Sequence, residues 1–171
     1  MGIIKDRVSI EYRPEVVQGR SRIGDMEVDL MLGKQDGPPL LVMTDRAIMV
    51  TKIDLLPSEE AHRVAATIAD RVLRVGCSWI KTITFDCGLE FAGHGTVAQR
   101  CGVKTYFTRP YTSQHKVTVE NRIGLIRRWL PKGTERIKEI ETMINNRRVR
   151  KFGYLTPIEK LKSSWPVAII T

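Results

Sequence analysis

The sequence predicts an α/β fold in which a mixed five-stranded sheet is flanked by helices. Three observations predict it: β-rich runs come first, a long amphipathic helix follows them, and the remaining strands alternate with helices. The chain has 171 residues, 42% of them hydrophobic, which is enough to bury the core of one domain. We predict an extended N-terminal arm over residues 1–23 and one core over residues 24–171.

The first half of the sheet is predicted to be a meander of three strands. Residues 26–32 alternate between apolar and more polar side chains, with the period of two that is typical of a strand. The apolar positions are Met26, Val28, Leu30 and Leu32, and the less apolar face carries Glu27, Asp29 and Met31. β-rich runs follow at 40–45 and 48–56, and strands this close in sequence usually pair antiparallel.

Helices and two further strands complete the predicted core. Residues 57–76 have helical periodicity, and strands at 79–85 and 104–108 enclose a short helix at 91–103. This alternation favours parallel strands joined by helical crossovers. Terminal helices are predicted at 117–130, 135–148 and 156–162. Ribonuclease-H-like folds have this order of elements.

The charge of the chain favours a polyanionic partner. Lys and Arg total 28 against 19 Asp and Glu, so the net charge is +9, which suits DNA, RNA or an acidic membrane. Because the sequence has neither an apolar run of the roughly 18 residues needed to span a bilayer nor a signal peptide, we expect a cytoplasmic protein. Cys77, Cys87 and Cys101 form no CxxC pair, so we expect reduced core cysteines.

Three acidic residues fall at positions where chemistry is expected. Asp86 ends a predicted strand before a glycine, where an Asp is by itself often a turn-former. Asp29 lies inside an apolar strand, where a carboxylate loses hydration unless a cation or a donor compensates. The first and fourth strands of this fold can be neighbours, so Asp29 and Asp86 can meet at one edge. Glu120 borders the apolar stripe of the helix at 117–130.

Four motifs resemble a known family. RVSIEYRPEVVQGRSRIGDMEVDLMLGK, TITFDCGLEFAGH, ENRIGLIRRWLPKGT and INNRRVRKFGYLTPIEKL resemble the catalytic core of DDE transposases of the insertion-sequence thirty family, within the retroviral-integrase superfamily. The resemblance implies that Asp29, Asp86 and Glu120 are catalytic and bind two Mg²⁺ or Mn²⁺ ions. It also implies DNA cleavage and strand transfer, with mobile-element ends and target DNA as partners, and at least a dimer when active.

The basic residues near these acids are expected to contact DNA. The predicted DNA-binding residues are Lys116, Asn121, Arg127, Arg128 and Lys132. Contacts of Lys and Arg to phosphates give affinity without sequence specificity. The later run of Arg147, Arg148, Arg150 and Lys151 is either a solvated surface or a further backbone clamp.

The chain departs from the family pattern just before Glu120. Val117 stands where family members resembling this chain carry a glycine, so backbone strain is predicted if that position needs a positive φ. Two alternatives therefore stay open: a catalytically impaired remnant that binds DNA or partner subunits, and a structure-selective ribonuclease-H-like nuclease. His94 and His115 are expected to be surface or capping groups without a catalytic role.

Overall fold

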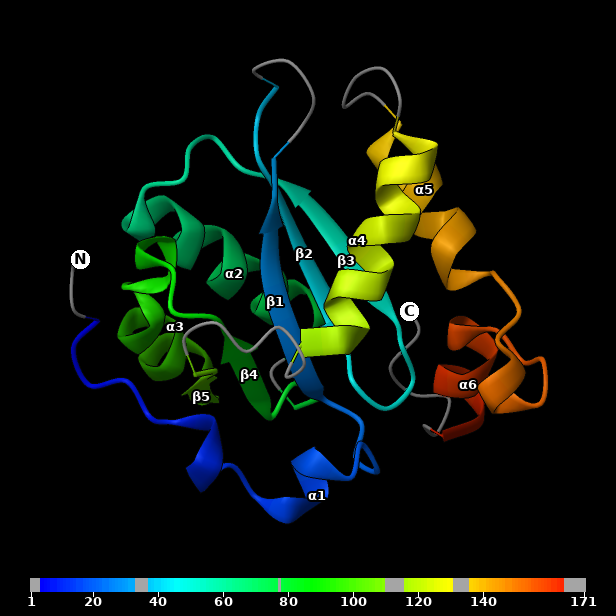
Figure 1. Ribbon diagram of the computed structural model, residues 1–171, viewed down its shortest axis with the longest axis horizontal. Helices are drawn as coiled ribbons and strands as arrows, with labels where there is room; N and C mark the ends of the chain where they lie inside the picture. Colours follow the sequence, from blue (N-terminus) through cyan, green and yellow to red (C-terminus); the bar gives the residue numbers. More distant parts are fainter. Residues whose placement is uncertain (1–3, 33–36, 77, 110–115, 131–135, 165–171) are drawn as a thin grey trace.

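A single five-stranded sheet forms the centre of the molecule in the computed structural model, which describes residues 4–32, 37–76, 78–109, 116–130 and 136–164. The strands are β1 (Asp25–Met31), β2 (Leu40–Asp45), β3 (Thr51–Leu55), β4 (Thr82–Phe85) and β5 (Lys104–Phe107). They lie in the order β3-β2-β1-β4-β5 (Figure 1). β1 to β3 pair antiparallel, whereas β1–β4 and β4–β5 pair parallel. The predicted meander and the adjacency of the first and fourth strands are confirmed.

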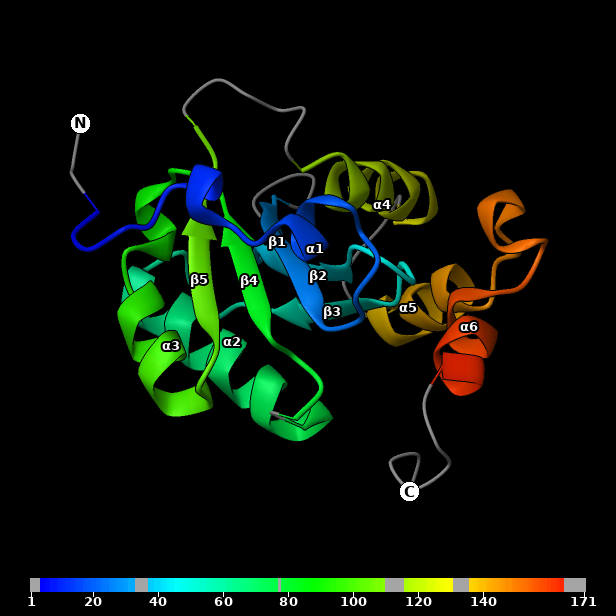
Figure 2. The same ribbon diagram turned by 90° about the horizontal axis from the view of Figure 1, so that it is seen from below.

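Helices cover both faces of the sheet (Figures 1 and 2). On one face lie α2 (Ala61–Val75) and α3 (His94–Cys101), and on the other lie α4 (Val117–Trp129) and α5 (Ile137–Asn145). The shorter helical elements are η1 (Ile10–Tyr12), α1 (Glu15–Gln18), η2 (Leu89–Phe91), η4 (Arg150–Phe152) and α6 (Pro157–Ser164). None of the helices in the described ranges has the length and apolar character needed to cross a bilayer.

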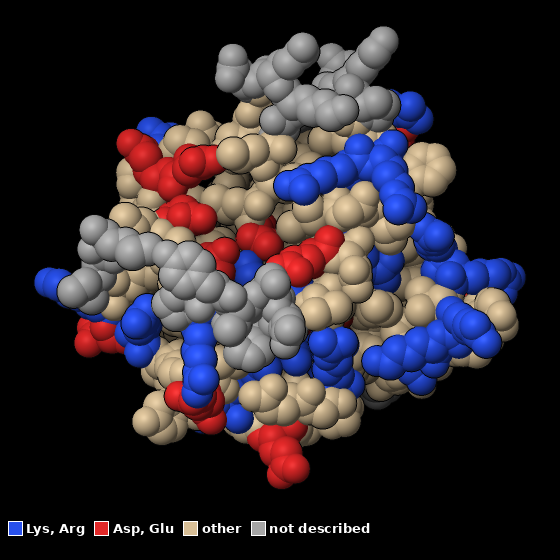
Figure 3. Space-filling view, in the orientation of Figure 1, with Lys and Arg blue, Asp and Glu red and all other residues tan. Residues whose placement is uncertain are grey.

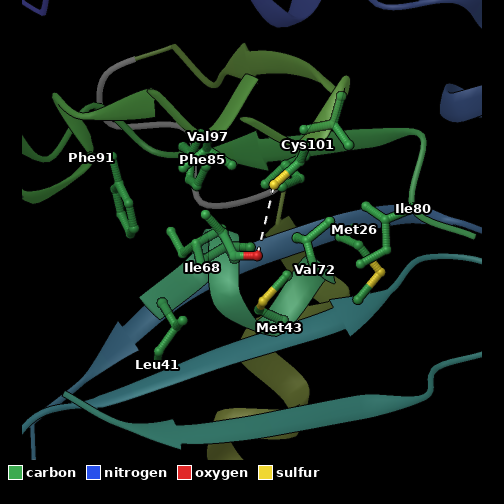
Figure 4. Close-up of a cluster of buried hydrophobic side chains, with 14 of the residues drawn as sticks. Met26, Leu41, Met43, Ile68, Val72, Ile80, Phe85, Phe91, Val97 and Cys101 are labelled. Carbon is green, nitrogen blue, oxygen red and sulfur yellow. Dashed lines mark hydrogen bonds between the residues drawn. The ribbon is translucent and has the colours of Figure 1, made fainter. Parts of the chain in front are cut away.

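Alternate side chains of the strands enter two separate hydrophobic clusters. On the first face, Met26, Leu41 and Met43 point toward Ile68 and Val72 of α2 (Figure 4). The second cluster joins the sheet to α4 and α5, and its main members are Met31, Leu40, Val42, Ile53, Val119, Ile123, Ile126, Ile140 and Ile144. Because helices cover both faces, the strands are apolar on both sides.

The predicted polarity of β1 is wrong at two positions. Met31, placed on the less apolar face, is fully buried in the second cluster because α4 covers that face. Leu32, placed on the apolar face, is 65% exposed because the strand ends at Met31.

The N-terminal segment 4–23 packs along the edge of the sheet where the arm was predicted, and it includes the short helical elements η1 and α1 (Figure 2). Ser9 forms a parallel bridge to Phe107, and the buried Arg13 donates from Nη1 to Thr84 Oγ1 at 3.1 Å. The side chains of Ile10 and Val17, which belong to this segment, are buried. These contacts attach the segment to β4 and β5.

Gly24 fixes the start of β1 between two other strands. Its N–H donates to Asp45 Oδ2 at 2.7 Å, and its carbonyl accepts from Lys81 N at 2.7 Å. Its φ is +96°, and a Cβ here would lie 1.9 Å from the carbonyl oxygen of Trp79. A glycine is therefore required by both the conformation and the space.

His94 is a buried structural residue, so its predicted surface or capping role is wrong. One ring nitrogen lies 3.0 Å from Thr105 Oγ1 and the other 3.0 Å from the Lys5 carbonyl oxygen. Its ring also meets Phe107 edge-on. Cys101 is buried as expected and donates to the Ala69 carbonyl, whereas Cys87 is half-buried and donates to the Thr108 carbonyl. Cys77 and His115 lie outside the described residues.

Candidate active site

Asp29 and Asp86 lie at the same end of two neighbouring parallel strands. β1 and β4 pair with Glu27 opposite Thr84, and the same register continued by two residues places Asp29 beside Asp86. Asp86 directly follows the last residue of β4. Since paired positions of parallel strands point to the same face, both carboxylates are directed toward α4.

One cation lies between these two carboxylates. Lys116 Nζ is 3.0 Å from Asp29 Oδ2 and 3.1 Å from Asp86 Oδ2, and the Lys116 side chain is only 6% exposed. The other oxygens accept backbone N–H groups: Asp29 Oδ1 from Leu30 and Asp86 Oδ1 from Gly88, both at 2.9 Å. Asp86 is therefore a turn-former through one oxygen and a cation-binding group through the other.

The electrostatics of this region favour the binding of positive charge. Burial raises the pKa of Asp29, and the Lys116 ammonium opposes that rise. Burial also raises the pKa of Glu120 and of Glu90, with further upward contributions from the negative charge of Asp29. Figure 3 shows acidic side chains gathered over the centre of this face, around β1 and the start of α4. A divalent cation there would relieve the repulsion between these carboxylates.

Glu120 stands near this pair but does not close a ligand set with it. It is exposed on the first turn of α4. Within the described ranges, no three His, Cys, Asp or Glu side chains are grouped closely enough to hold a metal ion. The structure thus brings Asp29 and Asp86 together through Lys116 and leaves Glu120 on the adjacent helical turn.

The strain predicted at Val117 is absent. Val117 is the first residue of α4 and has a helical backbone, so the position requires no positive φ. The condition for strain is therefore not met, because the helix begins at Val117 as predicted and a helical φ is negative.

Glu27 is a positioning residue that the sequence did not reveal as one. Its side chain is fully buried, its Oε2 accepts the Val119 N–H at 2.8 Å, and it forms an ion pair with Arg46. Arg46 in turn donates from Nε to the Val17 carbonyl at 3.2 Å. Glu27 therefore holds the first turn of α4 on β1 and, with that turn, Lys116 and Glu120. The available signal was a second acid on the strand face that carries Asp29.

The predicted DNA-binding residues occupy different environments. Asn121, Arg127 and Arg128 are exposed on α4, and none of them forms an ion pair with another described residue. Lys116 is buried against two carboxylates, so its contact with DNA stays a prediction. Lys132 lies outside the described residues.

The fold is that of a retroviral integrase core. The crystal structure of the catalytic core domain of BIV integrase matches with a TM-score of 0.63 and 18% identity, covering 82% of this chain and 95% of that one. The similarity confirms the ribonuclease-H-like fold that the order of elements predicted.

Sequence comparison narrows this class to the insertion-sequence transposases. The chain is 43% identical to the transposase of IS4351 from Bacteroides fragilis, over 94% of this chain and 51% of the relative. It is 29% identical to the transposase of IS1086 from Cupriavidus metallidurans, over 94% and 49%, and 29% identical to the transposase InsI of IS30A from Escherichia coli K12, over 88% and 41%. No family model matches. The chain is thus similar in sequence to insertion-sequence transposases, among them InsI of IS30A, as its motifs indicated, and it spans about half the length of these relatives or less.

Proposed function

We propose that this chain is the DNA-cleaving and strand-joining core of an insertion-sequence transposase, with Asp29, Asp86 and Glu120 as its catalytic carboxylates. The observation that carries the proposal is the convergence of Asp29 Oδ2 and Asp86 Oδ2 on one cation. The chain covers about half of its relatives or less, so its substrates are proposed as well. They are the ends of a mobile element and target DNA. Joining two ends to one target implies at least a dimer.

The donor set fits Mg²⁺ or Mn²⁺. Both ions prefer hard oxygen ligands, and the two aspartate oxygens already converge on the point where an ammonium sits. Asp29 and Asp86 would hold one ion, and Glu120 would complete the set for two. Such a pair of ions, when bound, activates a water or a 3′-hydroxyl and stabilises the leaving oxygen of the phosphodiester.

Residues around the carboxylates would orient the site and the DNA. Glu27 holds the first turn of α4 in place through its hydrogen bond to Val119 N. The Lys116 ammonium offsets one of the two aspartate charges, and it would be free to contact a phosphate if a divalent ion took its place. Arg127 and Arg128, exposed further along α4, would bind backbone phosphates and position the strand.

Nicking of supercoiled plasmid in Mn²⁺ tests this proposal. Asp29→Asn, Asp86→Asn and Glu120→Gln should each lower the nicking rate by at least about a hundredfold, because each removes charge that stabilises the transition state. Asp70→Asn is the matched control, since Asp70 is exposed on α2 and pairs with Arg100. Nicking at the wild-type rate by any of the three site variants would refute the assignment of that residue.

The same assay separates the two alternatives. The Lys116 ammonium between the aspartates is the observation that favours a DNA-binding remnant, because a permanent internal cation would exclude metal. Salt-dependent DNA binding without any nicking by the wild-type chain would support that remnant. Cleavage of an RNA–DNA hybrid in preference to duplex DNA would support the nuclease.

A further inference from the structure

A groove lined by arginines runs along the outer side of α4. Its first part is a cavity of about 240 Å³ between α4, the turn that links β2 to β3, and the segment after α5. Arg122, Arg147, Arg148 and Arg150 line it. Figure 3 shows basic side chains gathered over this side of the molecule, around α5 and the segment that follows it.

Arg122 is buried in this groove, and no acid of the described ranges forms an ion pair with it. Arg122 is only 4% exposed, and its Nη2 donates to the Met49 carbonyl at 3.1 Å. Its buried Nε has no hydrogen-bond partner among the described residues. Burial and the nearby charge of Arg147 lower the pKa of Arg122 to about 10. A buried cation with an unused donor is unfavourable by itself and attracts an anion.

The other buried arginines in the described part of the chain differ in this respect. Arg46 pairs with Glu27 and Arg71 pairs with Asp54. Burial and the charge of Arg46 lower the pKa of Arg13 to about 10, but the charges of Glu27 and Asp25 oppose that lowering. The buried Arg13 Nε, like that of Arg122, has no hydrogen-bond partner among the described residues. Around Arg122, by contrast, Arg147 and Arg150 add positive charge and form no ion pair with any described residue. Among the described residues, the groove therefore has a local excess of positive charge around Arg122.

The second part of the groove adds an aromatic surface. A cavity of about 630 Å³ shares Leu125 and Arg147 with the first and is also lined by Arg128, Trp129 and Met143. Trp129, at the end of α4 opposite to Glu120, is 50% exposed, and Met143 of α5 is 41% exposed. Trp129 lies nine positions after Glu120 on the helix, about 14 Å along the axis.

We propose that this groove binds an unpaired stretch of DNA, with backbone phosphates at Arg122, Arg147 and Arg150 and a base stacked on Trp129. Anionic groups and flat aromatic rings alternate at close spacing in a nucleic-acid strand, and arginines interleaved with an exposed indole suit that pattern. An unpaired strand fits better than a duplex, because the bases of a duplex are stacked inside it and their faces are not free to meet the indole. The inference rests on the proposed function in one respect, that DNA is the ligand, but it uses residues outside the carboxylate site.

Fluorescence anisotropy in EDTA, with a labelled single strand and the matching duplex, tests the groove without the metal site. Trp129→Ala should weaken single-strand binding at least about fivefold, as expected for the loss of one stacked base, and change duplex binding by less than about twofold. Arg147→Ala combined with Arg150→Ala should reduce the salt dependence of single-strand binding, with a slope smaller by about 1 to 2. The matched control is Arg74→Ala combined with Lys104→Ala, which removes the same charge from exposed positions on α2 and β5.

Arg122→Gln adds a readout that a structural role would not give. If the guanidinium awaits a phosphate, its loss should weaken single-strand binding while the melting temperature stays the same or rises. A lower melting temperature with unchanged DNA affinity would overturn the assignment of Arg122.

Equal losses in the groove variants and in the charge-matched control would overturn the proposal as a whole, since binding would then reflect net charge alone. Sedimentation would show whether Trp129→Ala shifts the monomer–dimer equilibrium. Such a shift, together with an unchanged single-strand affinity in anisotropy, would make the groove a protein interface instead. If the groove variants bind single-stranded DNA normally while metal-dependent nicking is also normal, the groove proposal fails and the proposed function stands. If Asp86→Asn loses nicking but still binds single-stranded DNA normally, the groove acts independently of the carboxylate site.

Discussion

Replacement of Lys116 by Met should weaken the metal-free fold and strengthen metal binding. The Lys116 ammonium makes contacts of 3.0 and 3.1 Å with two carboxylates, and Met keeps the apolar stem without the charge. Breaking a fully buried ion pair costs about 3–5 kcal/mol, but Asp86 is 37% exposed and Asp29 is 19% exposed, so we expect about 1–3 kcal/mol. In a protein of this size the melting temperature should fall by about 3–10 °C.

Divalent ions should reverse this loss. In the wild-type chain an ion must displace the ammonium, whereas in Lys116→Met it meets two uncompensated carboxylates. A difference of about 1.4 kcal/mol corresponds to a factor of ten, so Mn²⁺ should bind the variant at least about tenfold more tightly. Thermal melts across a Mn²⁺ titration measure both effects, because a ligand that binds only the folded state raises its stability in proportion to the logarithm of its concentration.

Lys52→Met is the matched control, since Lys52 pairs with Glu141 at 3.2 Å on β3, outside the carboxylate site. This control should leave the Mn²⁺ dependence unchanged. Competition between Lys116 and the metal is excluded if Lys116→Met binds Mn²⁺ no more tightly than the wild-type chain, or if Lys52→Met shows the same gain.

Three further predictions concern the scaffold of the site. Glu27→Gln should destabilise the chain by about 3 kcal/mol in urea unfolding, because it leaves the buried Arg46 without its carboxylate. Gly24→Ala should cost more than about 3 kcal/mol through its clash with the Trp79 carbonyl, whereas Gly102→Ala, with open space around it, should cost about 1 kcal/mol; equal costs would contradict the steric argument. Burial raises the pKa of Asp45 to about 6, so its stabilising contribution is complete below about pH 4 and is lost as pH rises through about 6. Between about pH 4 and pH 6, the free energy of unfolding of the wild-type chain, measured in urea, should fall by about 2–3 kcal/mol relative to that of Asp45→Asn.

The order of the sheet was predictable because its signals are local. Strand alternation at 26–32 and helical periodicity at 57–76 are each contained in one short segment, and a helical crossover from β3 to β4 permits the parallel pairing of β1 with β4. The positions of Asp29 within a strand and of Asp86 after a strand were predictable for the same reason. The run at 48–56 was overestimated as a strand because Met49 adopts a positive φ of 63° and turns the chain before β3.

The partners of these residues were not predictable, because they arise from packing between distant segments. The position of Lys116 between two aspartates depends on the placement of α4 over β1, which Glu27 determines through Val119. Arg122 carries no sequence signal of burial, because a charged residue beside an apolar stripe usually faces solvent. It is buried only because other segments of the chain pack over that side of α4.

A crystal of the wild-type chain soaked in Mn²⁺ would show whether Asp29 and Asp86 bind a divalent ion. We expect an anomalous peak beside Asp29 Oδ2 and Asp86 Oδ2, with the Lys116 ammonium displaced from its place between them. The Asp86→Asn crystal, soaked in the same way, should lack that peak. A wild-type crystal in which Lys116 still bridges both carboxylates, with no anomalous peak beside them, would show that the two aspartates are not a metal site.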